Sequence, residues 1–178
     1  MQRAAIAVLG LLALAAPARA ERQADRVIVR GDGFAFGVKE PPAWRADLGH
    51  ASRFGAHVLF YRTKHALRGG ATLIMVRLNR NPGRSADDDL RHDMDDYRKR
   101  FGDVAFRDLE VSHPEFRCFA KEFTVESLFH EYLTYLNPGD GTTERFAAVL
   151  NTESAASPEE LEAYRAIVGS LVLMPPQP

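Results

Sequence analysis

The chain has 178 residues, with 23 Lys and Arg against 24 Asp and Glu and a formal net charge of −1. This length suits one domain with a sizeable core. The near-neutral charge and the absence of a basic run argue against binding to nucleic acid or to an anionic membrane surface. Cys118 is the only cysteine, so no disulfide can form within the chain and its stability must come from the core.

The first twenty residues have the pattern of a secretory signal peptide. Arg3 gives a positive start, residues 4–16 are apolar or glycine, and Ala18-Arg19-Ala20 is a small-x-small cleavage site. The apolar run is too short to span a bilayer, and no other segment approaches the roughly 20 apolar residues that a membrane helix needs. The sequence therefore predicts cleavage after Ala20, a periplasmic or secreted location, and one mature domain over residues 21–178.

Short apolar stretches predict strands in the first half of the chain. Gly31-Asp32-Gly33 and Gly69-Gly70 are turn formers, and Pro41-Pro42 stops an extended strand. The segment from Arg45 to Gly55 has no clear period and is interpreted as a loop. The expected strands are 26–30, 34–38, 56–62 and 71–78. The last two are apolar on both faces, which predicts cover on both sides of the sheet centre.

A charged amphipathic helix is predicted from Ser85 to Phe101. Ser85 is a good N-cap, acidic residues fill the first turn, basic residues fill the last turn, and Gly102 ends the helix. The apolar stripe of this helix is narrow, so it should lie on a sheet with its other face in water. The stripe consists of Leu90, Met94, Tyr97 and Phe101.

Three strands with short connections then predict an antiparallel meander, preceded by a strand at 104–111. The meander strands are 117–125, 128–136 and 145–151. A second helix begins at Ser157-Pro158-Glu159-Glu160, which has the pattern of a capping box with proline at the first position. Its buried stripe runs to Leu171, and Pro175–Pro178 is a loose tail. This order predicts an α+β domain: a mainly antiparallel sheet covered by helices on both faces, that is, an αβα sandwich.

The segment Gly33-Phe34-Ala35-Phe36-Gly37-Val38, followed by Pro41-Pro42 and Trp44, resembles the opening motif G-F-x-F-x-V-P-x-G-W of the PsbP-like and DcrB-like families. The order of hairpin, charged helix, meander and C-terminal helix also resembles these families over most of the mature chain. The chain departs from the motif at Ala43, where the families have glycine, and in a longer segment before the prolines. The resemblance implies an αβα sandwich. It also implies a non-enzymatic protein, such as a photosystem II subunit or assembly factor, a periplasmic protein, or a binding or chaperone module.

The first candidate site is a possible metal site on the charged helix. Asp88, His92 and Asp95 lie at i, i+4 and i+7, on the side opposite the apolar stripe. Carboxylate and imidazole groups at this spacing can hold a divalent metal. Arg91 and Arg98 lie nearby and would neutralise the carboxylates, so a solvated charged face is the favoured interpretation. No metal or other cofactor is predicted.

The second candidate site is a ligand-binding groove beside the proline loop, lined by Trp44, Arg45 and His57. The favoured alternative is that Trp44 closes one end of the sandwich. No catalytic constellation is recognised. A tight turn at Glu126-Ser127 would pair His130 near Phe123, roughly 16 Å along the strand from Cys118, too far for a nucleophile and its base.

The leading hypothesis is an exported, non-enzymatic protein that binds or assists a partner in the cell envelope. An exposed set of aromatic side chains on the meander would suit partner recognition, although aromatics this dense are usually core. This set is Phe129, Tyr132 and Tyr135. The alternatives are a metal-dependent or ligand-processing periplasmic enzyme and a small-molecule carrier with a pocket between helix and sheet. The sequence names neither the ligand nor the partner.

Overall fold

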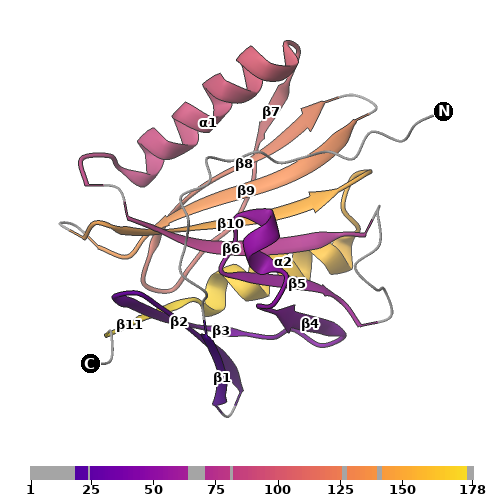
Figure 1. Ribbon diagram of the computed structural model, residues 1–178. Coiled ribbons are helices and arrows are strands. Elements are labelled where there is room, and N and C mark those ends of the chain that lie inside the picture. Colours follow the sequence, from indigo (N-terminus) through magenta and orange to yellow (C-terminus); the bar gives the residue numbers. More distant parts are fainter. Residues whose placement is uncertain are drawn as a thin grey trace.

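A computed structural model of the protein describes residues 19–23, 25–63, 71–80, 82–125, 128–139 and 142–175. The described residues form three layers, with a seven-stranded antiparallel sheet in the middle (Figure 1). The strands of this central sheet lie in the order β4 (Trp44–Asp47), β5 (Val58–Arg62), β6 (Leu73–Arg80), β10 (Glu144–Thr152), β9 (Phe129–Asn137), β8 (Arg117–Val125) and β7 (Ala105–Asp108).

The two faces of the central sheet carry different elements. One face carries α1 (Ala86–Phe101) and the 3₁₀ helix η1 (Ala51–Phe54). The other carries α2 (Pro158–Ser170) and a second, four-stranded sheet. The strands of the second sheet lie in the order β1 (Arg19–Gln23), β2 (Arg26–Gly31), β3 (Phe34–Lys39) and β11 (Val172–Met174).

Both faces of the central sheet are buried because each is covered by other elements. Neighbouring residues of each strand point to opposite faces. In β10, Ala147 packs in a cluster with Leu90 of α1, whereas Ala148 packs in a cluster with Tyr164 of α2. The predicted α+β class, the antiparallel sheet and the helical cover on both faces are confirmed. The second sheet on one of these faces, which contains the predicted strands at 26–30 and 34–38, was not expected from the sequence.

The helices begin where their caps predict. The Ser85 side chain accepts a hydrogen bond from the Asp88 backbone N–H, and the Asp88 carboxylate accepts one from the Ser85 backbone N–H. Ser157 and Glu160 form the same reciprocal capping box before α2. Each box satisfies backbone donors that the first helical turn leaves without a partner.

The predicted loop at 45–55 is wrong, since it contains most of β4 and all of η1. The strand β4 has only four residues and pairs with the outer edge of β5, so its sequence is too short to show the alternation of a strand. The predicted strand at 104–111 is shorter, because Leu109 and Val111 leave the sheet and pack against the core under α2. The three residues of β11, beside the predicted tail, were also not foreseen.

Tyr164 fixes α2 on the centre of the sheet. Its fully buried hydroxyl donates to the Ala148 carbonyl of β10 at 2.8 Å and shares a second hydrogen bond with the Thr134 hydroxyl of β9 at 2.8 Å. Ala148 and Thr134 are direct partners across the two strands. One side chain therefore holds the helix against β9 and β10, two neighbouring strands of the meander.

We predict that Tyr164→Phe lowers the free energy of unfolding by about 1–3 kcal/mol, because it removes a hydrogen-bond partner from two buried polar groups. Urea denaturation of the purified protein measures this change. The matched control is Tyr61→Phe, which removes the hydroxyl of a half-buried residue on β5 and should change stability by less than about 0.5 kcal/mol. Equal stability of Tyr164→Phe and wild type would contradict this role.

Candidate functional site

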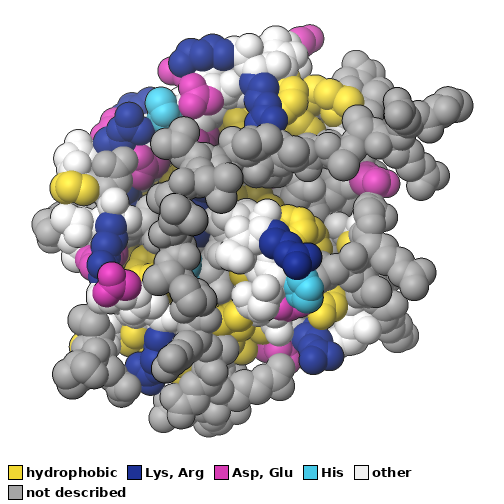
Figure 2. Space-filling model, viewed as in Figure 1, with side chains coloured by type: hydrophobic (Ala, Val, Ile, Leu, Met, Phe, Trp, Pro, Cys, Tyr) yellow, Lys and Arg dark blue, Asp and Glu magenta, His cyan; other side chains and the backbone are white. Residues whose placement is uncertain are grey.

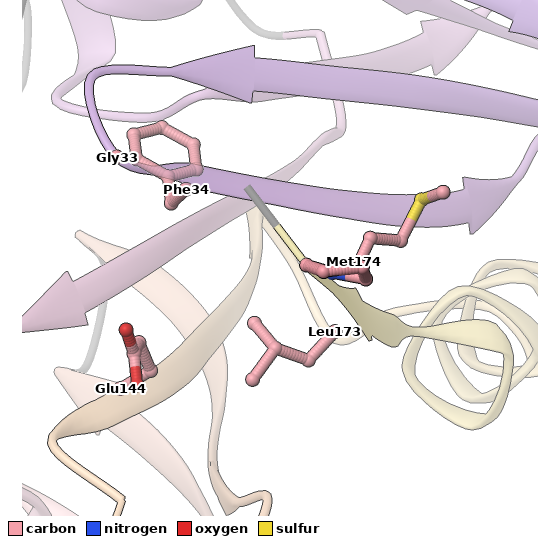
Figure 3. A pocket seen from close by; sticks show the side chains of 6 residues that line it. Gly33, Phe34, Glu144, Leu173 and Met174 are labelled. Carbon is pink, nitrogen blue, oxygen red and sulfur yellow. The ribbon is translucent and has the colours of Figure 1, made fainter. Parts of the chain in front are cut away.

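A hollow of about 310 Å³ opens between β3, β10 and β11 (Figure 3). It is lined by Gly33, Phe34, Glu144, Leu173, Met174 and Pro175. In Figure 3 the Leu173 side chain points toward Glu144, whereas the Met174 side chain runs along β3. The hollow is therefore mostly apolar, with one carboxylate on its wall.

Arg80, at the end of β6, holds the mouth of the hollow together. Its guanidinium donates to the carbonyl oxygens of Asp32 and Gly33 in the β2–β3 turn and forms an ion pair with Glu144 at 3.5 Å. Its carbon Cζ also lies 5.9 Å from the centre of the Phe34 ring. Gly33 has a φ of +69°, a conformation that favours glycine in this turn. One arginine thus joins both sheets at the rim.

The strand β11 forms one wall of the hollow, and hydrogen bonds hold the link between α2 and β11 in place. Nε2 of His113 donates to the Leu171 carbonyl at 2.8 Å, because Nδ1 accepts from the backbone N–H groups of Glu115 and Phe116 and so carries no hydrogen. Arg26 of β2 donates to the Ser170 carbonyl at 2.6 Å. On its far side, β11 pairs with no strand of the described residues.

A buried polar network, which the sequence analysis missed, joins α1 to the central sheet. The Tyr135 hydroxyl donates to Asp93 at 2.7 Å and accepts from Arg77 at 3.2 Å. Glu131 accepts from the Tyr97 hydroxyl and from the Asn151 amide. Burial raises the pKa of both Asp93 and Glu131 above the ordinary carboxyl range.

A buried ion pair extends the contact between α1 and the sheet, since Arg145 Nε lies 2.8 Å from the Asp89 carboxylate. Asp89 and Asp93 are four residues apart and lie beside the apolar stripe of α1. This spacing was a usable sign that the underside of the helix is partly polar. The sequence interpretation considered only Asp88, His92 and Asp95, on the opposite side of the helix. The network bonds its members to one another and so docks α1.

The proposed metal ligands lie on the exposed side of α1, where Figure 2 shows Lys, Arg, Asp and Glu side chains gathered along the upper part of the molecule. Hydrogen bonds from Ser85, together with Arg91, hold the pKa of Asp88 far below its usual range. His92 pairs with Asp96 at 3.4 Å, and Asp95 pairs with Arg98 at 3.2 Å. Among the described residues no three His, Cys, Asp or Glu side chains are arranged to hold a metal ion.

The structure does not bring Trp44, Arg45 and His57 together in a groove. Trp44 is buried at the start of β4 and pairs across the strands with Arg62, whereas His57 precedes the opposite end of β5. The His57 ring lies 4.7 Å from the Phe34 ring, and its Nδ1 accepts from the Leu78 N–H. Burial and the nearby Arg77 charge lower the pKa of His57. His57 thus supports the wall of the hollow.

The aromatic set of the meander is core. Phe129, Tyr132 and Tyr135 are each at most 4% exposed, so they form no recognition patch. Cys118 pairs with Leu136 and His130 with Thr124, one residue from the predicted Phe123. Thr124, the strand partner of His130, is six residues from Cys118 along β8, so Cys118 and His130 are not neighbours. Burial raises the pKa of the Cys118 thiol to about 11.

The fold is similar to that of a known structure. Neither a protein-family model nor a curated protein matches the sequence. The solution structure of cyanobacterial PsbP (CyanoP) from Synechocystis sp. PCC 6803 matches 93% of this chain and 99% of its own, with a TM-score of 0.50 and 12% sequence identity. The chain has the PsbP-like fold. The short motif around Phe34 and Trp44 therefore indicated the correct fold.

We predict a pH-dependent stability difference between the wild type and Glu131→Gln. The raised pKa means that folded Glu131 keeps its proton to higher pH than the unfolded chain does. Its contribution to stability is therefore complete below its ordinary pKa of 4.5 and is lost as pH rises through the folded value. Relative to the wild type, Glu131→Gln should gain stability as pH rises.

Urea denaturation at several pH values from about 4 to about 8 measures this difference. Glu162→Gln is the control, because it removes an exposed carboxylate from α2 and leaves the network intact. A stability difference for Glu131→Gln that does not change with pH would contradict the assignment of a buried, reluctantly ionised carboxyl.

Proposed function

We propose that the protein is exported and acts without catalysis, by binding or assisting a protein partner in the cell envelope. The observation that carries the proposal is the hollow between β3, β10 and β11. Apolar walls with a charged rim are typical of a site that holds a side chain or small group in place. Glu144 is the one carboxylate among the residues that line the hollow, and it is paired with Arg80.

Export rests on the signal-peptide pattern of the first twenty residues, most of which lie outside the described residues. The predicted cleavage after Ala20 falls within β1, whose residues Glu21–Gln23 pair with Val27, Ile28 and Arg26 of β2. Cleavage there would leave a shorter β1 still paired with β2. In the described part of the chain, no helix is long and apolar enough to cross a membrane.

The absence of a catalytic role is supported by where the perturbed groups lie. A general acid or base must face a substrate within hydrogen-bond reach. Asp93, Glu131, Tyr97 and Tyr135 are instead bonded within the network under α1, and none of them lines the hollow. Their raised pKa values follow from burial in a structural contact.

Native mass spectrometry of the protein, purified gently from the cells that produce it, tests the proposal. We predict a mature chain that begins at Glu21 and a complex with a second protein chain. Leu173→Trp should remove the second chain, because the larger side chain fills the hollow. Leu128→Trp is the matched control at an exposed turn and should retain it.

A spectrum without a second protein chain would contradict the proposal, and a metal ion or small ligand bound in its place would favour the enzyme or carrier alternative. A second chain retained by Leu173→Trp would leave the proposed function standing but show that the partner binds away from the hollow.

A further inference from the structure

We infer that β11 and the hollow together bind an extended segment of the partner chain, which pairs with the outer edge of β11 and places one apolar side chain in the hollow. The inference rests on the proposed function and specifies its partner. An exposed strand edge offers unpaired backbone N–H and C=O groups, and an extended peptide is the group that satisfies a row of them. Within the described residues, β11 pairs with β3 on one edge only.

The end strands of the two sheets differ in how they protect their edges. Charged side chains on an edge strand discourage pairing with another chain. β1, β4 and β7 each contain charged residues, with the sequences RAERQ, WRAD and AFRD. β11 has the sequence VLM and carries no charge. Among the described end strands, β11 is thus the one whose sequence leaves its edge open to pairing.

The hollow lies directly beside this edge and sets the chemistry of the inserted side chain. Leu173, Met174 and Pro175 belong to β11 or follow it, and the Phe34 ring forms the opposite wall (Figure 3). A volume of about 310 Å³ is near the lower end of ligand pockets, which span about 300–1,000 Å³. One aliphatic or aromatic side chain of an extended peptide therefore fits the hollow better than a larger free ligand.

The carboxylate on the wall favours a basic residue next to that apolar side chain. Glu144 is the carboxylate among the lining residues. Arg80 Nε lies 3.5 Å from Glu144 Oε1, but the hydrogen bonds of the Arg80 guanidinium go to the Asp32 and Gly33 carbonyls. A partner segment with Lys or Arg two positions from its apolar residue would place a second cation on the side of the strand that faces Glu144.

Backbone amide NMR with a blocked peptide, Thr-Lys-Thr-Leu-Thr-Lys-Thr, tests the inference. Titration into the isotopically labelled mature protein should shift the amide signals of Val172–Met174 and Phe34. It should also slow hydrogen exchange at the outward-facing amides of β11. Replacing the central Leu of the peptide with Asp, or Leu173 of the protein with Trp, should weaken binding by about tenfold or more, since a buried Leu side chain contributes about 1.5–3 kcal/mol. Leu128→Trp should bind the peptide as the wild type does.

Shifts confined to the β4 or β7 edge would overturn the inference. So would unchanged β11 amides with peptides carrying Leu, Phe or Val at the centre, each at millimolar concentration. If native mass spectrometry still finds a second protein chain in that case, the proposed function stands and only the location on β11 fails. If it finds no second chain, the proposed function fails as well.

Discussion

The hydrogen bonds of the Tyr164 hydroxyl to Ala148 and Thr134 position the elements on which the rest of the structure depends. They fix α2 across β9 and β10, and α2 leads directly into β11. The turn after α2 is held by His113 and Arg26, so the place of β11 beside β3 follows from the place of the helix. The hollow lies where the end of that short strand comes near Glu144, the first residue of β10. A core contact thus determines the geometry of a surface site.

The two faces of the central sheet are stabilised by different chemistry. The α2 face is largely apolar, and its cluster includes Phe36, Phe60 and Phe146. The α1 face combines a small apolar cluster with the network of Asp93, Glu131 and their partners. A helix docked through hydrogen bonds and a buried ion pair is tied to one position, because these bonds depend on direction whereas apolar contacts do not. The perturbed carboxyls are therefore explained by docking.

Much of the fold could be predicted from the sequence because its signals are local. The Ser85 and Ser157 caps define both helix starts, and turn formers delimit the meander strands. The polar underside of α1 could not be predicted, because Asp89 and Asp93 look like solvent residues until the sheet supplies Arg145 and Tyr135. The hollow was also beyond reach, since it joins residues 33, 144 and 173 through a three-residue strand without a pattern. His57, which the sequence grouped with Trp44 and Arg45, lies instead beside the Phe34 ring, a neighbour that no local pattern indicates.

The central claim is that β11 and the hollow form the partner-binding surface. Site-specific photo-crosslinking in the intact cell envelope tests it directly, with a benzophenone side chain at position 174 in one variant and at position 95, on the exposed side of α1, in another. The account predicts a crosslinked adduct with one protein from position 174 and none from position 95. Adducts from position 95 alone would contradict it.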